Sequence, residues 1–171
     1  MIHVQEDPID VAALLSTFAC GDTGVGGIAT FIGQVRHEAG EDEAGDGLRA
    51  LVLEHYPGMT ECKLAEIDRQ AHARWDLKST LIIHRVGRMV PGEIIVVVAT
   101  AAAHRGDALQ ACEFLIDRLK TRAPFWKREE RAEGDHWIEA RLSDRQAAER
   151  WDTPGDKEPT PETLAGTDSA H

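Results

Sequence analysis

The chain of 171 residues has few cysteines and aromatic residues, and no recognisable metal-binding motif. Its cysteines, Cys20, Cys62 and Cys112, form no CxxC pair and no zinc-finger arrangement with histidine, which excludes a disulfide framework and argues against a zinc site. Because Cys62 and Cys112 fall on expected helices, we expect buried, reduced thiols. Motifs such as DxD and HExxH are also missing, so neither a metal nor another resident cofactor is expected.

The chain is also poor in positive charge. Its formal net charge is −11, whereas binding to nucleic acid or to an anionic membrane needs a broad basic face. We therefore expect no nucleic-acid or membrane partner, and any basic site must be local. The sequence shows neither a leader peptide nor an apolar run of membrane-spanning length, so a cytoplasmic location is expected.

What the chain does contain suits one globular domain. Its hydrophobic content of 42% is enough for a proper core at this length. We expect the domain to cover residues 1–151. Residues 152–171 carry prolines and mostly acidic residues without a core-forming pattern, which predicts a disordered tail.

Apolar periodicity and turn residues predict a mixture of helices and strands. Helices are expected at 10–19, 59–75, 107–121 and 143–151, and strands at 27–36, 48–55, 79–86, 93–100 and 137–141. Asp10 and Thr60 are the expected N-caps of the first two helices. Pro124 cannot continue the third helix, which must end near it. The glycines between positions 21 and 27 lack the phosphate-loop frame and favour a plain turn.

Four cations gather where the third helix ends. They are Lys120 and Arg122 in the last turn, and Lys127 and Arg128 directly after the aromatic pair Phe125 and Trp126. Buried aromatic rings can fix the loop that carries neighbouring charges, so the pattern favours an anion pocket. The alternative is that these cations only complement the dipole at the helix C-terminus.

Further cations come from two other places. Arg36 stands at the end of an expected strand, and His104 and Arg105 stand at a strand-to-helix turn, where backbone N–H groups bind anions readily. The alternative for the second pair is a solvated loop. Together these groups suit a phosphorylated small molecule, with a lysine as acid, base or oxyanion stabiliser. A Ser-His-Asp mechanism has no GxSxG motif to support it.

Several longer segments match one family. They are LKTRAPFWKR at 119–128, AHR at 103–105, LEHYPGM at 53–59 and IHRVG at 83–87. Taken in order, they resemble the large, catalytic subunit of molybdopterin synthase, and the resemblance runs from about Gly27 to Trp151. It implies an α+β, hammerhead-like fold with antiparallel sheets and flanking helices.

The resemblance also implies a reaction and its partners. The family is a sulfurtransferase of molybdenum cofactor biosynthesis. It takes sulfur from the C-terminal Gly-Gly thiocarboxylate of a small, ubiquitin-like carrier (MoaD-like) and transfers it to cyclic pyranopterin monophosphate, forming the dithiolene of molybdopterin. Two large subunits form a homodimer within a heterotetramer. Because the sulfur arrives on the carrier, no cysteine of this chain needs to be catalytic.

The family's site residues carry over position by position. Lys120 and Lys127 match the catalytic lysines, and the substrate-binding positions match Gln34, Val35, Arg36, His104, Arg105, Lys120, Lys127, Arg128 and Glu129. In the family, His104 and Arg105 come from the other protomer. One departure is Gln34, where some members have lysine. A second is the acidic loop at 38–46, which we expect near the mouth of the pocket.

Two other classes of function are compatible with the same cations. A non-catalytic module would use them to recognise a phosphorylated ligand or the acidic tail of a protein, and it would predict unaltered turnover when Lys120 and Lys127 are both replaced by alanine. A nucleic-acid binder would show steep salt dependence on long polyanions, which the net charge disfavours.

Overall fold

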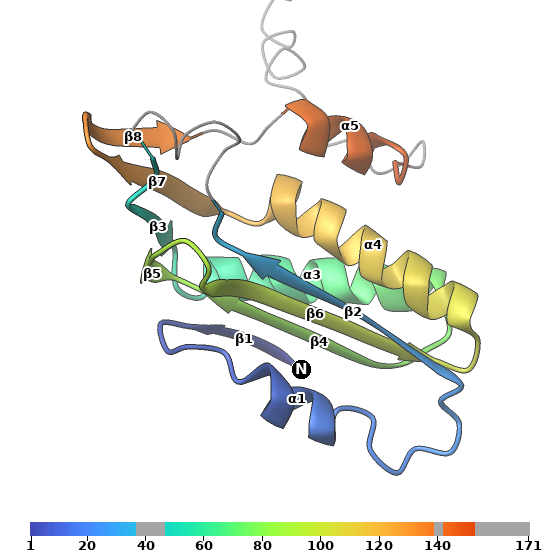
Figure 1. Ribbon diagram of the computed structural model, residues 1–171. Helices are drawn as coiled ribbons and strands as arrows, with labels where there is room; N and C mark the ends of the chain where they lie inside the picture. Colours follow the sequence, from blue (N-terminus) through green and yellow to red (C-terminus); the bar gives the residue numbers. More distant parts are fainter. Residues whose placement is uncertain (37–46, 139–141, 153–171) are drawn as a thin grey trace, which may run out of the picture.

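The computed structural model describes residues 1–36, 47–138 and 142–152, which form two mostly antiparallel sheets with helices around them (Figure 1). The first sheet has the order β1-β4-β6-β2 and contains β1 (Ile2–Gln5), β2 (Gly27–Gln34), β4 (Leu77–Arg85) and β6 (Ile94–Ala102). The second has the order β5-β3-β7-β8 and contains β3 (Ala50–His55), β5 (Gly87–Met89), β7 (Phe125–Arg131) and β8 (Gly134–Ile138). The helices are α1 (Val11–Thr17), α3 (Met59–Arg74), α4 (Arg105–Arg122) and α5 (Leu142–Glu149). The expected α+β class is confirmed, although β1 pairs with β4 in parallel.

Helices cover both faces of the first sheet, with α3 and α4 on one face and α1 on the other (Figure 1). The central strands β4 and β6 are therefore apolar on both sides. Ile82 and Val98 belong to the core shared with α3 and α4, whereas Leu81 and Val97 belong to the core shared with α1. This burial explains the nearly continuous apolar runs of both strands, because side chains alternate between the two faces.

Helix α4 packs an apolar stripe against the first sheet and ends where the sequence predicts. Ala108, Ala111 and Leu115 are almost fully buried at helical spacing. The helix ends at Arg122, two residues before Pro124, and it begins at Arg105 with His104 as N-cap, two residues earlier than expected. Its last turn therefore carries Lys120 to the junction between the two sheets.

The expected N-cap of α3 was wrong. The cap is Gly58, with a φ of 84°, a conformation that glycine adopts at little cost. The Glu61 carboxylate accepts a hydrogen bond from the Gly58 N–H at 2.6 Å. Thr60 instead lies in the first turn with its hydroxyl buried, where it accepts from the Tyr56 N–H at 3.3 Å. Asp10 does cap α1, since it accepts from the Ala13 N–H at 3.0 Å.

The segment after Pro124 is a strand, not the loop expected from the sequence. β7 pairs with β3 on one side and β8 on the other. Its aromatic residues also do not both form a buried plug. Phe125 stacks on His84 with ring centroids 4.1 Å apart, but Trp126 is 50% exposed. Lys127 and Arg128 are thus held by strand pairing more than by aromatic packing.

Other expectations were partly wrong or fall outside the described residues. Cys112 is buried as expected, whereas Cys62 is exposed. β8 begins at Gly134, before the expected strand, and α5 begins at Leu142 and ends at Glu149, whereas the helix was expected at 143–151. The acidic loop at 38–46 lies outside the described residues, and so does the expected tail at 152–171 except for its first residue, Asp152. Within the described part of the chain, no helix is long and apolar enough to cross a membrane.

Candidate functional site

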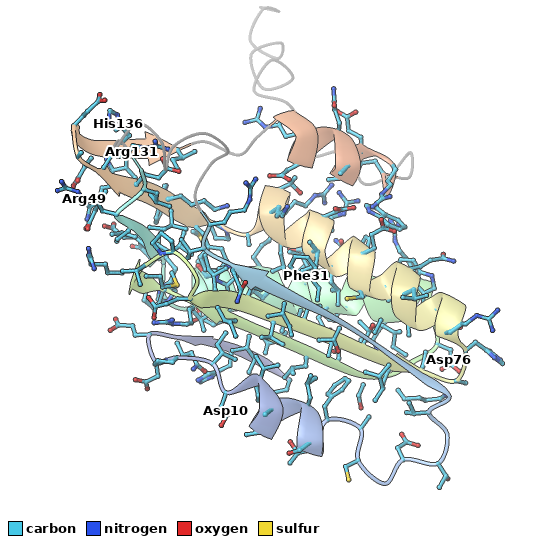
Figure 2. The ribbon with its side chains drawn as sticks, in the orientation of Figure 1. Asp10, Phe31, Arg49, Asp76, Arg131 and His136 are labelled. Atoms are coloured by element: carbon cyan, nitrogen blue, oxygen red, sulfur yellow. The ribbon has the colours of Figure 1, made fainter. Side chains whose placement is uncertain are left out.

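A hollow at the junction of the two sheets brings most of the candidate residues together. It has a volume of about 560 Å³ and adjoins a narrower cavity of about 130 Å³. Both are lined by Phe31, His84, Val96, Lys120, Lys127 and Ile138, and the larger one also by Gln34, Val35, Arg36, Glu129 and Asp144. Phe31 is labelled on β2 in Figure 2. We refer to the two together as the lysine cavity.

Lys120 reaches the lysine cavity from the last turn of α4. Its side chain is 47% exposed, and its Nζ lies 3.1 Å from a carboxylate oxygen of Asp144 on α5. Since this ion pair is partly open to water, it adds little to the stability of the fold. Lys120 is therefore available for chemistry at the cavity mouth.

Lys127 reaches the same cavity from β7. Side chains alternate along a strand, so Lys127 and Glu129 share the face that lines the cavity. Burial lowers the pKa of Lys127 below its ordinary value; Asp144 opposes this shift, and the charge of Lys120 adds to it. Among the described residues, no carboxylate forms an ion pair with Lys127. A lysine in this setting gives up its proton more readily than one in water.

His84, near the end of β4, lines both parts of the lysine cavity. Its Nδ1 lies 2.8 Å from the Arg85 carbonyl oxygen, which only accepts, so Nδ1 carries the proton. Burial lowers the pKa of His84 to about 4; the bond to Arg85 opposes this, and the charges of Lys127 and His55 add to it. At neutral pH the ring is uncharged, and its Nε2 is an acceptor.

Three consecutive candidates line the cavity at the end of β2. Gln34 is the last residue of the strand, and Val35 is buried, with its N–H donating to the Glu93 carbonyl at 2.9 Å. Arg36 follows on the cavity wall and is exposed. Glu129 lies opposite on β7, where it accepts from Arg131 Nε at 2.7 Å. The cavity thus combines three cations, Arg36, Lys120 and Lys127, which suit an anionic ligand, with the carboxylates of Glu129 and Asp144.

The other candidates lie elsewhere in the same chain. Arg128 belongs to the opposite face of β7 and pairs with Asp135 on β8. His104 and Arg105 stand at the N-terminus of α4, where they line a separate hollow with Gly26. Arg105 and Lys120 are separated by fifteen residues of helix, or about 22 Å at ~1.5 Å per residue. One chain alone does not bring these groups together.

Sequence reasoning missed His84 and Asp144 as members of the site. His84 lies within the IHRVG segment, but a histidine in an apolar strand gives no signal of its own. Asp144 comes from α5, whose docking on α4 depends on long-range contacts that no local pattern reveals. Within the described residues, no cluster of histidine, cysteine and carboxylate side chains is suited to hold a metal ion.

The family profile described as MoaE protein matches residues 4–122. This match covers more than half of the chain. The chain belongs to the MoaE family. The expected family is therefore confirmed, and the segments at 53–59, 83–87 and 103–105 lie inside the matched region.

Individual MoaE relatives agree with this assignment. A molybdopterin synthase catalytic subunit from Ralstonia nicotianae is 47% identical over 150 residues, which are 88% of this chain and 83% of the relative. The one from Escherichia coli is 54% identical over 126 residues, covering 74% of this chain and 81% of the relative. The solved structure of a molybdopterin biosynthesis MoaE protein from Burkholderia ambifaria has a TM-score of 0.73 and 44% identity, covering 88% of this chain and 97% of that one.

These MoaE relatives also confirm the expected function. The chain is an enzyme of molybdenum cofactor biosynthesis, with the sulfur-transfer activity of a molybdopterin synthase catalytic subunit.

Proposed function

We propose that the lysine cavity is where sulfur passes from a carrier protein to the substrate. The donor is the C-terminal Gly-Gly thiocarboxylate of a small, ubiquitin-like carrier, and the acceptor is cyclic pyranopterin monophosphate. The observation that carries the proposal is that Lys120 and Lys127, from a helix and a strand, line one cavity. Its larger part, of about 560 Å³, is in the range of small-molecule sites.

The two lysines suit the charges that sulfur transfer creates. Once the thiocarboxylate sulfur has bonded to the substrate, water attacks the acyl carbon of the carrier and negative charge develops on the acyl oxygen, which a fixed ammonium group such as that of Lys120 stabilises. The C–S bond then breaks, so that the sulfur stays on the substrate and the carrier leaves as a carboxylate. Lys127, whose pKa burial lowers, gives up a proton more readily than a lysine in water and so suits proton exchange with the substrate. Arg36 and Gln34 contribute to substrate binding at the cavity wall.

The test is turnover with purified chain, thiocarboxylated carrier and cyclic pyranopterin monophosphate, followed by the fluorescence of oxidised molybdopterin. Lys120→Ala should abolish product formation while the thermal midpoint stays unchanged, because this side chain is 47% exposed and contributes no core volume. The matched control is Lys78→Ala, which removes a lysine paired with Asp76 away from the cavity. Full activity in the Lys120→Ala, Lys127→Ala double variant would refute the proposal.

We also propose that the chain acts as a homodimer. β2 is an edge strand of the first sheet, and it exposes apolar side chains beside α4. The exposed fractions are 51% for Ile28, 38% for Phe31, 43% for Ile32 and 60% for Leu109. Such an apolar surface suits a protein interface. A second chain is the simplest source of His104 and Arg105 for a site whose Lys120 lies about 22 Å from Arg105 along α4.

A mixing experiment tests this arrangement. Lys120→Ala and Arg105→Ala chains are each inactive alone if both residues are required. In a shared site, the mixed dimer contains one site with both residues intact, so co-refolding the two variants should restore activity. If each site lies within one chain, mixing restores nothing. The carrier-bound heterotetramer and the cytoplasmic location, both expected from the sequence, remain predictions; sedimentation of the chain with its carrier checks the first.

A further inference from the structure

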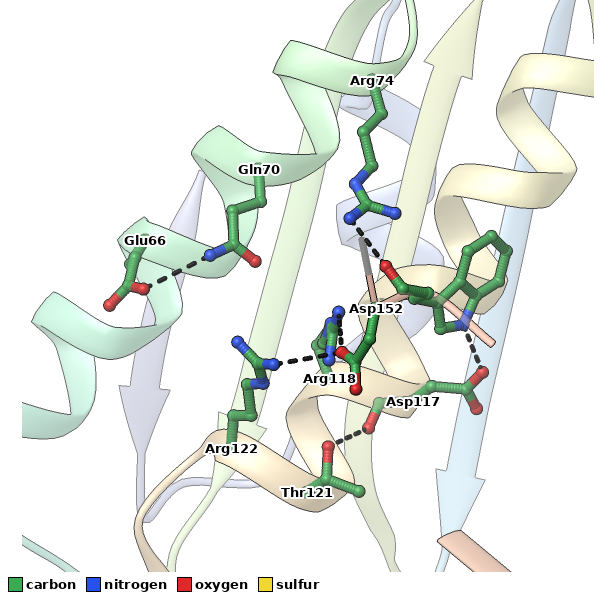
Figure 3. Close-up of polar contacts among 9 residues, drawn as sticks. Glu66, Gln70, Arg74, Asp117, Arg118, Thr121, Arg122 and Asp152 are labelled. Atoms are coloured by element: carbon green, nitrogen blue, oxygen red, sulfur yellow. Dashed lines mark hydrogen bonds and ion pairs between the residues drawn. The ribbon is translucent and has the colours of Figure 1, made fainter. Parts of the chain in front are cut away.

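The residues directly after α5 hold the end of this helix against α4 (Figure 3). Trp151 Nε1 donates to a carboxylate oxygen of Asp117 at 2.7 Å, and Arg74 donates to the Trp151 carbonyl at 2.8 Å. Asp152 lies 2.9 Å from the guanidinium of Arg118 and 3.3 Å from that of Arg122. We call this set of contacts, made by Trp151 and Asp152, the C-terminal anchor.

An aromatic cluster reinforces the C-terminal anchor. The Trp151 ring packs edge-on against Phe114 and Trp75, with centroid distances of 5.6 and 5.8 Å. Phe114 is fully buried in the main core. The end of α5 is therefore tied to the same core that carries α4, and the helix is held in place along its contact with α4.

The other end of α5 carries Asp144 into the lysine cavity. Its carboxylate is 22% exposed and lies 3.1 Å from Lys120 Nζ. A lysine side chain has four rotatable carbon bonds, so its ammonium group is poorly placed unless something holds it. Of the two lysines, Lys120 is the one with a carboxylate partner among the described residues.

We propose that Asp144 is a positioning residue, which holds the Lys120 ammonium group at the cavity mouth and is itself kept there by the C-terminal anchor. This inference rests on the proposed role of Lys120 in sulfur transfer. It makes α5 part of the catalytic unit, although none of its side chains needs to touch the reacting atoms. Catalysis is sensitive to such placement, since a misplacement of about 1 Å can lower a rate by on the order of 100-fold.

The opposite role would be a lock, in which Asp144 occupies Lys120 and must leave before the carrier tail enters. The two roles predict opposite changes in turnover when the charge of Asp144 is removed. If Asp144 positions Lys120, removing its charge slows turnover. If Asp144 is a lock, removing its charge speeds turnover.

The experiment compares Asp144→Asn, which keeps the size but removes the charge, with Asp144→Glu, which keeps the charge. Glu149→Gln is the matched control, because it removes an exposed carboxylate from the same helix outside the cavity lining. We expect Asp144→Asn to lower kcat on the order of tenfold with the KM for carrier within about twofold, since placement and not binding is affected. Asp144→Glu should restore much of this loss.

A second measurement needs no turnover. The rate at which an amine-reactive reagent labels Lys120, read by peptide mass spectrometry with Lys78 as internal reference, should rise in Asp144→Asn because the ammonium group is released. It should stay at the wild-type rate in Glu149→Gln.

The results separate this inference from the proposed function. Wild-type kcat and an unchanged labelling rate in Asp144→Asn would overturn the positioning role, and a raised kcat would overturn it in favour of the lock. If the wild-type chain itself makes no product, the proposed function fails, whereas the labelling rate still reports whether Asp144 holds Lys120.

Discussion

Replacing Asp152 by asparagine should destabilise the fold through a residue outside the lining of the lysine cavity. The Arg118 side chain is only 2% exposed, and Asp152 is the acidic residue that compensates its charge at 2.9 Å. Among the described residues, the Nε and one Nη of Arg118 have no hydrogen-bond partner, so the Asp152 carboxylate acts chiefly through its charge. Breaking a buried ion pair costs roughly 3–5 kcal/mol because the remaining charge is left uncompensated.

The expected cost lies at the lower end of that range. Asp152 is itself 24% exposed, and the Arg118 guanidinium keeps its contact with the Phe114 ring, 5.4 Å from the centroid. A loss of about 3 kcal/mol corresponds to a fall of roughly 6–12 °C in thermal midpoint for a chain of this size. Calorimetry at neutral pH measures it, with Glu149→Gln as the control.

A second variant identifies the cause of this loss. Adding Arg118→Met to Asp152→Asn removes the buried charge while keeping much of the side-chain volume, so much of the lost stability should return. A midpoint within about 1 °C of wild type for Asp152→Asn alone would contradict the reasoning. A double variant no more stable than Asp152→Asn would show that the buried charge is not the cause.

Two further predictions concern titratable groups. The pKa of His84 in the fold, about 4, lies below its ordinary value of 6.5, so its contribution to stability is present above pH 6.5 and is lost as the pH falls towards 4. This loss should lower the free energy of unfolding by about 2.5 kcal/mol between about pH 7.5 and about pH 4.5. In urea titrations, His84→Phe should remove this part of the drop. An equal drop in the variant would exclude His84 as the source. Cys20 and Cys62 are exposed, whereas Cys112 is buried and its pKa is raised to about 11. A thiol reagent should therefore modify Cys20 and Cys62 in the native protein, and Cys112 only after denaturation. Rapid modification of Cys112 in the native state would contradict its burial.

Much of the fold could be predicted from local patterns, and the exceptions have physical reasons. The apolar runs of β4 and β6 and the stripe of α4 reflect burial, which the sequence shows directly. β7 was missed because its sequence, FWKREER, carries charged side chains on both faces of the strand. Lys127 and Glu129 line the cavity, whereas Arg128 on the opposite face forms an ion pair with Asp135 of β8. Strand pairing across such a segment is decided by its neighbours and not by its own pattern.

Those candidate site residues that lie in segments resembling the family could be predicted from the sequence, whereas those brought in by the fold could not. The family resemblance pointed to Lys120 and Lys127, and the structure places both on one cavity. Asp144 could not be found in this way, because its contact with Lys120 spans 24 positions and depends on how α5 docks. His84 needed the structure for a different reason, since its burial and its bond to Arg85 decide which nitrogen is free.

The unbroken course of α4 has a consequence for the proposed dimer. Each copy of this helix would supply Lys120 to one site and His104 and Arg105 to the other. The length of the helix therefore fixes the distance between the two reaction centres. Its fifteen-residue span sets their separation at about 22 Å, and a helix hardly stretches or compresses along its axis. One inserted helical turn would lengthen α4 by about 5.4 Å. Lys120 of one chain and His104 and Arg105 of the other would then no longer meet in one site, although each chain had kept its own fold.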